Sequence, residues 1–416
     1  MYLISDIIYF RMKRSVIILL ALVPLIFSGL ETASAGAPKT KEAKYVFFFI
    51  GDGMGLQQVT LTETYLAYEK GVKGRELLNF SKFPVTGLVS TYSANADITC
   101  SAAAGTAMST GYKTKNNMIG MDPDTNRLES ITYKIHRKDI PVGIISTVTL
   151  DHATPSAFYA KYKDRKGYYE IARQLPESGF EFFGGGGFVY PAGKDKNQPD
   201  IYNLMQQKGY KIVRGLDNLP EGKIQGKLAL FQESGKEGEL PYAIDRSKED
   251  LTLRDIVKSA IGHLNGKRGF FIMAEGGKID WAAHSNDSRT AILEITDFAG
   301  AIEIAYNFYL EHPDETLIIV TSDHDTGGLG LGTRDGSSNF NLGALRPVIS
   351  SFAADSSSRN AIDTLNKTTG LGWTTDGHTS SDVIIYSIGA GSSLFSGKMD
   401  NTDIPRRILK AMNIVF

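Results

Sequence analysis

A serine and a scattered set of acids and histidines have the residue types that metal-assisted nucleophilic chemistry needs. Ser101 lies in an alanine-rich stretch from Cys100 to Gly111, and acids and histidines spaced like metal ligands occur over the rest of the chain. A serine hydroxyl is a poor nucleophile at its free pKa and needs a base or a Lewis acid beside it. Since the chain has many candidate ligands and no evident Ser/His/Asp relay, the residues favour a serine activated by metal ions.

Two of the candidate ligands have a helical spacing. Asp280 and His284 are four residues apart, so a helix would place both on one face, where they could bind one ion. Asp52 follows an apolar run in an Asp-Gly pair, and such a residue, like Glu275, is by itself more typical of a turn. Each of these motifs is weak evidence when it is taken alone.

Other candidates stand at the ends of predicted strands. Asp323 and His324 leave an apolar run as adjacent residues, which lets both reach one ion if the chain bends, and His378 directly precedes another strand. With His152, these residues flank one predicted sheet edge. Three further histidines have polar or helical contexts and are interpreted as surface or packing residues: His136, His263 and His312. The convergence of ligands at one edge, more than any single motif, indicates a metal site.

Ser101 and Arg165 have both structural and functional interpretations. A serine before small residues is typical of the N-cap of a tightly packed helix. A helix N-terminus also presents free backbone N–H groups to an anion, so a serine there could attack while those donors hold phosphate oxygens. Arg165 has a fork of donors that suits phosphate, although in isolation it would be a solvated charge.

The elements that must position these residues are those of an α/β fold. Short apolar runs that end in Gly or a polar residue, with helical patterns between them, predict a three-layer sandwich in which a central, mostly parallel sheet is flanked by helices. Strands next to candidate ligands are predicted at residues 45–50, 141–148, 270–274 and 316–321. Parallel strands share a direction, so these ends meet on one edge, where open α/β sheets bind ligands. Residues 291–310 predict a long amphipathic helix over one face.

The pattern changes between residues 184 and 250. A tetraglycine, Gly184 to Gly187, is followed by polar residues with weak periodicity, and strand character returns only in pieces such as 227–231. This segment is predicted to form a smaller insertion beside the main sheet. Because no Gly-Lys-Ser/Thr follows the glycines, they are interpreted as a flexible turn instead of a phosphate-binding loop.

The composition is that of an ordinary globular protein. The chain has 416 residues, of which 42% are hydrophobic and 22% charged, enough for one large domain with an insertion. Lys and Arg number 45 against 46 Asp and Glu, so no nucleic-acid-binding surface is expected. Since Cys100 is the one cysteine, no intramolecular disulfide can form.

Residues 1–35 are predicted to be a secretory signal peptide, with Met12 as its expected start. Two basic residues follow Met12, an apolar run extends from Val16 to Leu30, and Ala33-Ser-Ala35 fits the small-x-small pattern of a signal-peptidase site. A membrane anchor is the alternative, but the run is short for a bilayer and contains Pro24. We expect an exported protein, periplasmic or extracellular, whose mature form has no stable membrane anchor.

The motifs, taken in order, resemble those of the alkaline phosphatase family from roughly residue 44 to the C-terminus. The resemblance is specific because several motifs occur in the family order. They are Ile50-Gly-Asp-Gly-Met-Gly55, Ser101-Ala-Ala-Ala-Gly-Thr-Ala107, His152-Ala-Thr-Pro155, Glu275-Gly-Gly-Lys-Ile-Asp280, Ser322-Asp-His-Asp-Thr-Gly-Gly328 and Gly377-His-Thr379. The resemblance implies a catalytic domain over residues 44–416, in which residues 184–250 would be a crown-like subdomain.

The same resemblance implies two zinc ions and one magnesium ion. The first zinc would be held by Asp280, His284 and His378. The second, which also touches Ser101, would be held by Asp52, Asp323 and His324. The magnesium would be held by Asp52, Thr154 and Glu275. Imidazole and carboxylate ligands suit zinc, whereas an all-oxygen shell suits magnesium.

The implied reaction is the hydrolysis of phosphate monoesters by two in-line displacements. The second zinc stabilises Ser101 as an alkoxide, which attacks phosphorus while Arg165 grips two phosphate oxygens and the first zinc takes the leaving group. A water activated at the first zinc then hydrolyses the phosphoserine. The implied ligands are small phosphate monoesters and inorganic phosphate, and the family is often dimeric, so a homodimer is an open expectation.

Three residues depart from the commoner family pattern. His152 stands where some members have Asp, and it bears on the identity of the third metal. Trp281 stands where a basic residue often follows the ligand aspartate, and it is expected to line the mouth of the pocket. Cys100 stands where Asp often precedes the nucleophile, so a carboxylate that could orient Arg165 is lost.

Three other functions were weighed against the sequence. A sulfatase with a modified cysteine requires Cys-x-Pro-x-Arg, and the sequence after Cys100 has neither Pro nor Arg. A phosphodiesterase of the same superfamily is a closer rival, because the two-metal core is shared. A non-catalytic metal- or phosphate-binding protein is disfavoured by the complete ligand set and the intact Ser101.

Overall fold

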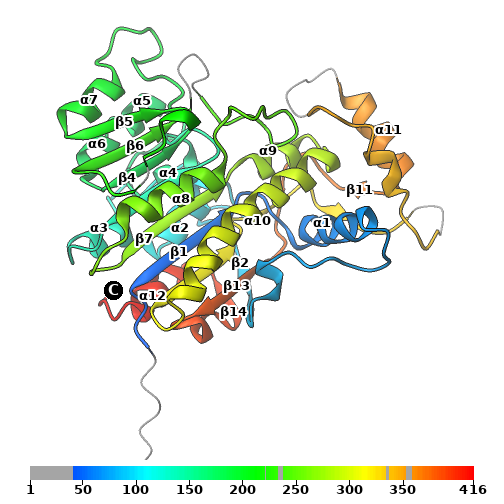
Figure 1. The fold of residues 1–416 in the computed structure, drawn as a ribbon. Helices are drawn as coiled ribbons and strands as arrows, with labels where there is room; N and C mark the ends of the chain where they lie inside the picture. Colours follow the sequence, from blue (N-terminus) through cyan, green and yellow to red (C-terminus); the bar gives the residue numbers. More distant parts are fainter. Residues whose placement is uncertain (1–40, 221, 233–237, 334–336, 353–357) are drawn as a thin grey trace, which may run out of the picture. The chain divides into compact units, whose positions relative to one another are not determined.

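The computed structural model describes residues 41–220, 222–232, 238–333, 337–352 and 358–416. The predicted signal peptide, residues 1–35, lies outside these ranges. The described residues belong to one compact unit, Thr40–Phe416. Its centre is a ten-stranded sheet in the order β14-β2-β13-β8-β1-β7-β3-β4-β6-β5 (Figure 1).

The strands of this sheet are short and mostly buried. They are β1 (Tyr45–Gly51), β2 (Val85–Ser90), β3 (Val142–Ser146), β4 (Phe182–Gly185), β5 (Tyr210–Arg214), β6 (Lys227–Phe231), β7 (Phe270–Gly276), β8 (Thr316–Thr321), β13 (Val383–Gly389) and β14 (Gly397–Asp400). Two small ladders lie outside it and pair β9 (Asp325–Thr326) with β12 (His378–Thr379), and β10 (Leu329–Gly330) with β11 (Gly372–Trp373).

Nearly all the neighbouring strands of the sheet run parallel. β1 pairs in parallel with β7 and with β8, and β3 pairs in parallel with β7 and with β4. β13 alone is reversed, since it pairs antiparallel with both β8 and β2. Because β13 runs the opposite way, its beginning lies near the edge at which β1, β7 and β8 end. The predicted α/β fold with a mostly parallel sheet is confirmed.

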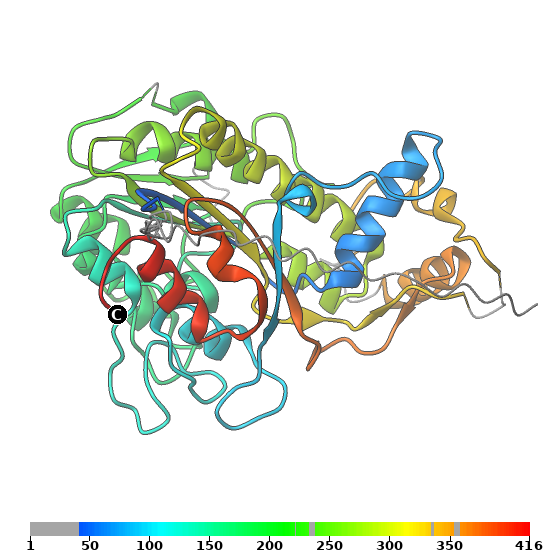
Figure 2. The ribbon, with the colours of Figure 1, turned by 90° about the horizontal axis from the view of Figure 1, so that it is seen from below.

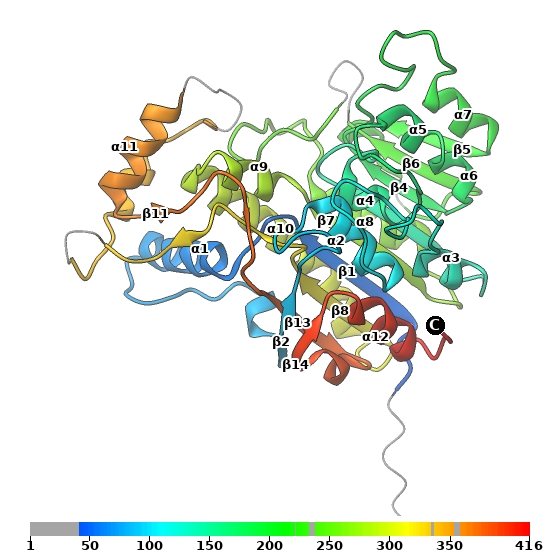
Figure 3. The same cartoon turned by 180° about the vertical axis from the view of Figure 1, so that it is seen from behind.

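Helices cover both faces of the sheet. Successive side chains of a strand point to opposite faces, so they pack in two separate cores. Val46, Phe48 and Ile50 of β1 pack in the core that contains residues of α2 (Ser101–Thr110), α3 (Ile131–His136) and α12 (Asp403–Ala411). Tyr45, Phe47 and Phe49 pack in the core that contains residues of α8 (Leu253–Leu264) and α10 (Ser288–Glu311). Figure 2 shows the sheet between α10 and α12. Figure 3 shows α2 and α12 over the face of the sheet to which Val46, Phe48 and Ile50 belong.

The helices vary greatly in length. They are α1 (Leu56–Glu69), α2 (Ser101–Thr110), α3 (Ile131–His136), α4 (Ala153–Ser156), α5 (Tyr168–Ala172), α6 (Leu175–Ser178), α7 (Ile201–Gln207), α8 (Leu253–Leu264), α9 (Lys278–His284), α10 (Ser288–Glu311), α11 (Arg359–Thr369) and α12 (Asp403–Ala411). The long helix expected at 291–310 is α10, which begins three residues earlier and is capped by the Asp287 carboxylate on the Thr290 N–H. A separate small core joins α1 to the beginning of α10 through Leu61, Tyr65 and Ile292.

The segment 184–250, expected as an insertion beside the main sheet, contributes strands to that sheet itself. β6 pairs in parallel with β4, and β5 pairs in parallel with β6, so that β5 forms one edge of the ten-stranded sheet. β6 has the bounds that the apolar run predicted. No helix among the described residues is long and apolar enough to cross a bilayer.

Candidate active site

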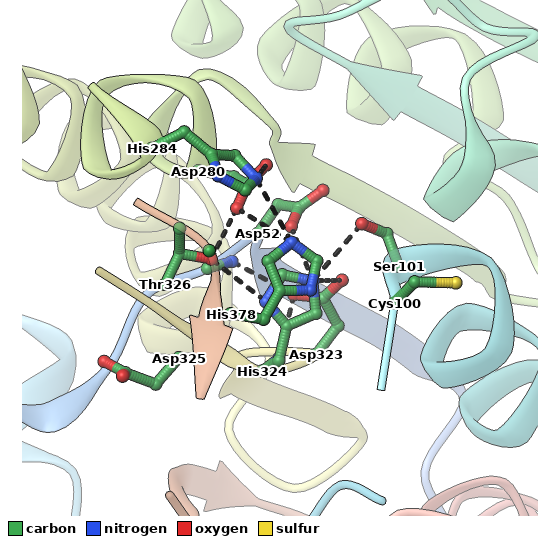
Figure 4. Close-up of polar contacts among 12 residues, drawn as sticks. Asp52, Cys100, Ser101, Asp280, His284, Asp323, His324, Asp325, Thr326 and His378 are labelled. Atoms are coloured by element: carbon green, nitrogen blue, oxygen red, sulfur yellow. Dashed lines mark hydrogen bonds and ion pairs between the residues drawn. The ribbon is translucent and has the colours of Figure 1, made fainter. Parts of the chain in front are cut away.

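The predicted site residues come together at the edge where the central parallel strands end. Asp52 directly follows β1, Glu275 is the sixth residue of β7, and Asp323 comes two residues after β8. In the parallel register, Ile50 is opposite both Glu275 and Thr321, so the chain segments that carry the three carboxylates leave the sheet at one level. Figure 4 shows Asp52 and Asp323 among the ring nitrogens of the histidines.

The remaining residues reach this edge from short elements above it. Asp280 and His284 project from one face of α9, as their spacing predicted. His378 opens β12, which pairs with β9 and so lies opposite Thr326. This two-residue ladder places His378 beside the end of β8, and the rings of His324 and His378 stack with centroids 3.5 Å apart.

Three groups of side chains have ligand atoms within 4.8 Å of one another, the separation that one bound cation allows. The first ligand cluster is Asp280, His284 and His378. The second ligand cluster is Asp52, Asp323 and His324. The third ligand cluster is Asp52, His152 and Glu275. Asp52 belongs to the second and third clusters, so the two sites would share a carboxylate.

Ser101 faces the second ligand cluster. Its Oγ lies 3.2 Å from His324 Nε2, and the residue is almost completely buried. It is the first residue of α2, after Cys100, whose extended backbone ends the preceding loop and whose side chain does not cap the helix. The first hydrogen bond of the helix is donated by Ala104, so the N–H groups of the preceding residues have no partner within α2. Ser101 therefore combines a hydroxyl with free backbone donors.

The two histidines of the first ligand cluster are oriented by backbone carbonyls. His284 Nδ1 lies 2.5 Å from the Asp376 carbonyl oxygen, and His378 Nδ1 lies 2.8 Å from that of Thr99. Since carbonyls only accept hydrogen bonds, both Nδ1 atoms carry the proton. The two Nε2 atoms then face each other, 3.2 Å apart. In the metal-free site a proton on His284 Nε2, which lies 3.3 Å from Asp280 Oδ2, occupies this contact, and a bound cation would take its place.

Buried carboxylate oxygens without partners also point to a cation. Among the described residues, Asp52 Oδ1, Asp323 Oδ2 and Glu275 Oε1 are buried and accept no hydrogen bond. The other oxygen of Asp323 accepts the N–H groups of Gly53 and His324, at 3.1 and 3.0 Å, and Ser146 donates to the other oxygen of Glu275. Each carboxylate is therefore held by one oxygen and offers the second to the site.

The pKa values of these carboxylates are raised because the carboxylates are buried close to one another. Burial, followed by repulsion from Asp323, raises the pKa of Asp52 well above its usual range. Burial likewise raises the pKa of Glu275 to about 8, and burial with repulsion from Asp280 raises that of Asp323 to about 7. The metal-free site would therefore hold protons at neutral pH, and a bound cation would replace them.

Asp280 behaves differently because it lies among the histidines. Burial alone would raise its pKa, but the hydrogen bond from His284 and the charges of the neighbouring imidazoles lower it. The same contact with Asp280 outweighs burial and raises the pKa of His284 to about 9. Burial lowers the pKa of both His324 and His378, so both rings are neutral at pH 7, the form that binds metals.

His152, Arg165 and Trp281 form the side of the site next to the third ligand cluster. Arg165 Nη2 lies 3.1 Å from His152 Nε2, and Trp281 packs edge-on against the His152 ring with centroids 5.9 Å apart. Burial and the adjacent guanidinium lower the pKa of His152 to about 3, so the ring is neutral. Since arginine only donates, Nε2 accepts its hydrogen bond, and Nδ1 is buried without a partner.

Two further predicted positions are placed next to the clusters. Thr154, in α4, lies with its hydroxyl 3.4 Å from Asp52 Oδ2. Cys100 accepts a hydrogen bond at its Sγ from the N–H of Asn117, and the Asn117 carbonyl accepts one from the N–H of Arg165. The segment that carries Arg165 is thus positioned through Asn117 and not through a carboxylate at position 100.

No role was predicted for Thr326, for the Asp376 carbonyl or for the Thr99 carbonyl. Thr326 bonds to Asp280 and His324 through its side chain. Its position two residues after His324 was a usable signal, because alternate residues of an extended segment point to the same side. The two carbonyls had no such signal, since any residue type supplies a backbone oxygen.

Comparison with known proteins gives a consistent family. A family model described as alkaline phosphatase matches residues 43–347 and 346–414. Alkaline phosphatase 4 and alkaline phosphatase 3 of Bacillus subtilis (strain 168) are each 31% identical to the chain, over 97% of its length and 98% of theirs.

Solved structures agree with the sequence relatives. The cold-active alkaline phosphatase of a psychrophilic Shewanella species superposes with a TM-score of 0.79 at 28% identity, over 88% of this chain and 99% of that one. The alkaline phosphatase of the Antarctic bacterium TAB5 gives 0.74 at 29% identity, over 91% and 100%. A variant of the TAB5 enzyme with glutamate in place of a histidine has magnesium bound in its M3 site. The chain belongs to the alkaline phosphatase family and is a metal-dependent phosphoric monoester hydrolase.

Proposed function

We propose that the enzyme hydrolyses phosphate monoesters through a covalent phosphoserine at Ser101, with two zinc ions and one magnesium ion in the three ligand clusters. The observation that carries the proposal is the position of the Ser101 hydroxyl, 3.2 Å from His324 Nε2 and at the N-terminus of α2. A nucleophile placed there faces the metal ligands on one side and free backbone donors on the other.

The residues fit the proposed metals. The first and second ligand clusters offer carboxylate oxygens and neutral imidazole nitrogens, which are zinc ligands. The third offers Asp52 and Glu275, with the Thr154 hydroxyl beside them, while His152 uses its Nε2 lone pair on Arg165, and oxygen ligands suit magnesium. When bound, the zinc ions would supply the positive charge that favours the ionised form of the attacking oxygen and stabilises the leaving oxygen.

The protein itself would bind and orient the phosphoryl group. The free N–H groups at the beginning of α2 would donate hydrogen bonds to phosphate oxygens, and the partial positive charge of the helix N-terminus would favour the anion. Arg165 would contribute two parallel N–H donors. Its hydrogen bond from Nη2 to His152 holds the guanidinium in one orientation. Since these groups recognise only the phosphoryl part, the rest of the substrate is weakly specified.

Export and a homodimer remain proposals that rest on the sequence and on the family. The signal-like residues 1–35 support export to the periplasm or the extracellular space, with cleavage near Ala35. N-terminal sequencing of exported protein is expected to begin near Gly36, and recovery of Met1 or Met12 would contradict it. Light scattering of the purified protein determines whether it is a dimer.

The test compares the purified wild type with Ser101→Ala on an aryl phosphate monoester, a phosphodiester and a sulfate ester at alkaline pH. The monoester is expected to be the preferred substrate of the wild type, with activity lost on treatment with a chelator and restored by zinc and magnesium. Ser101→Ala is expected to lose most of the turnover. Turnover that persists without metal, or a preference for the diester, would contradict the proposal.

A further inference from the structure

The hydroxyl of Thr326 contacts one residue of the first ligand cluster and one of the second. Its Oγ1 lies 2.5 Å from Asp280 Oδ1 and 3.2 Å from His324 Nδ1, and the side chain is completely buried (Figure 4). Thr326 lies between two side chains that would bind different metal ions.

The protons of this contact can be placed in one way. A hydroxyl has a single proton, and an ionised carboxylate only accepts, so Thr326 donates to Asp280. Its oxygen must then accept from His324, which puts the imidazole proton on Nδ1. The His324 Nε2 lone pair then faces the second ligand cluster, 3.2 Å from Ser101 Oγ, 3.2 Å from Asp323 Oδ2 and 3.4 Å from Asp52 Oδ1.

We propose that Thr326 is a positioning residue that fixes the tautomer of His324 and the orientation of Asp280, and so links the two zinc sites. The proposal rests on the proposed function for the identity of the metal. All three histidines of the zinc clusters follow one scheme, with Nδ1 held by a protein oxygen. For His284 and His378 that oxygen is a backbone carbonyl, whereas for His324 it belongs to a side chain that substitution can remove.

The backbone near Thr326 holds the hydroxyl of this residue in position. The Thr326 N–H donates to the Gly53 carbonyl at 3.1 Å, and Gln58 Nε2 donates to the Thr326 carbonyl at 2.7 Å. A Cβ atom at Gly53 would lie 2.7 Å from both Asp280 Oδ1 and Thr326 Oγ1, too close for either. Gly53 has a φ of +69°, a conformation that favours glycine. The backbone hydrogen bonds of Thr326 therefore fix the position of its hydroxyl, and the glycine at position 53 leaves the space that the hydroxyl occupies.

Zinc binding by the metal-free protein tests the proposal with the metal alone as probe. Thr326→Val keeps the shape and removes the hydroxyl, and is expected to weaken zinc binding by about 10- to 100-fold, the usual effect of losing a group that orients a ligand. Thr326→Ser keeps the hydroxyl and is expected to bind like the wild type. Thr316→Val is the matched control. Thr316 is equally buried, but it is the first residue of β8 and so lies at the end of that strand away from the ligand clusters. Equal affinity in wild type and Thr326→Val would overturn the proposal.

The tautomer of His324 is a second readout, independent of activity and of metal. In ¹⁵N-histidine-labelled metal-free wild type, the imidazole signals lost in His324→Gln identify the ring, and we expect its proton on Nδ1. A proton on Nε2 would overturn the proposal even if Thr326→Val did not fold. Failure of the wild type to bind zinc would instead contradict the proposed function, while the tautomer would still decide the role of Thr326.

Discussion

Among single residues, the ligand side chains have a common arrangement: one polar atom is hydrogen-bonded to the protein, and the other is directed into the site. The carboxylate of Asp323 uses one oxygen on backbone N–H groups, and the imidazoles of His284 and His378 use Nδ1 on backbone carbonyls. The remaining atoms of these side chains face one another across the clusters. Such an arrangement is unfavourable without a cation and favourable with one.

Arg165 gives a prediction at this scale. Arg165→Lys keeps the charge but loses the planar pair of donors and the contact with His152 Nε2. We expect KM for an aryl phosphate to rise by about 10-fold and inhibition by inorganic phosphate to weaken by a similar factor, as one charge-assisted hydrogen bond is lost. Steady-state kinetics measure both.

The matched control for this substitution is Arg173→Lys. Arg173 forms an exposed ion pair with Glu170 on α5, away from the clusters, so the same exchange is expected to leave KM unchanged. An unchanged KM in Arg165→Lys would show that Arg165 does not bind phosphate.

At the scale of elements, the strands that carry ligands were the most predictable part of the chain. β8 has the bounds that its apolar run predicted, and β1 and β7 extend theirs by one and two residues. β4 and β5 were not predicted, because one contains two glycines and the other two basic residues, which weaken the apolar pattern. The two-residue strands β9 and β12 have no sequence signal, since they are too short to show a period.

The candidate ligands could be predicted for the same reason, and their partners could not. Asp52 and Asp323 follow apolar strands and belong to recognisable motifs, so their meeting at one edge follows from parallel strands. The contact of His378 with that edge depends on the β9–β12 ladder, and the contact of Arg165 with His152 depends on loop geometry. Such tertiary contacts are not encoded by local spacing.

The close packing between the beginning of α1 and β9 gives a prediction at the scale of elements. A Cβ atom at Gly55 would overlap the Asp325 carboxylate and lie 2.7 Å from its Cγ. Asp325 accepts a hydrogen bond from Thr379 that joins β9 to β12, so its displacement would move His378. Gly55→Ala is expected to destabilise the fold by about 1–3 kcal/mol, the usual cost of overpacking, and to weaken zinc binding.

Thermal unfolding and zinc titration of Gly55→Ala check this expectation. The control is Gly300→Ala, because Gly300 lies within α10 and a Cβ atom there meets nothing within 4 Å. That exchange is expected to stabilise the protein by about 0.5–1 kcal/mol through helix propensity. A Gly55→Ala variant as stable as the wild type would refute the proposed packing constraint.

At the scale of the whole molecule, the metal ions are expected to be part of the stability of the fold. The clusters join residues that follow β1, β7 and β8 to residues on α9 and β12, which are far apart in the sequence. A cation bound only by the folded state stabilises it by mass action. Removal of metal leaves buried carboxylates whose raised pKa values make their ionisation unfavourable.

The pH dependence of the metal-free protein follows from these pKa values. Glu275 and Asp323, with pKa values of about 8 and 7, keep protons in the folded state that the unfolded chain has already lost at pH 6.5. Unfolding then releases protons, so stability falls as pH rises through that range, by at most about 1.4 kcal/mol per pH unit for each group. His284, with a pKa of about 9, acts in the same direction.

We therefore expect the melting temperature of chelator-treated protein to fall from pH 6.5 to pH 8.5, and the gap to the zinc-loaded protein to widen. The histidines with lowered pKa values are neutral in the folded protein and become neutral in the unfolded chain as the pH rises past about 7.5, so they oppose the trend only at the lower end of this range. In Glu275→Gln the fall of the metal-free protein is expected to be shallower. A metal-free protein that becomes more stable over this range would contradict the electrostatic description.

Phosphorylation of Ser101 during turnover can be measured directly. The wild type is mixed with an aryl phosphate, quenched in acid and digested, and the peptides are analysed by mass spectrometry. One added phosphoryl group is expected on the peptide that contains Ser101, absent from Ser101→Ala and from chelator-treated wild type. A wild type that turns over the monoester and never carries phosphate on Ser101 would contradict the proposed function.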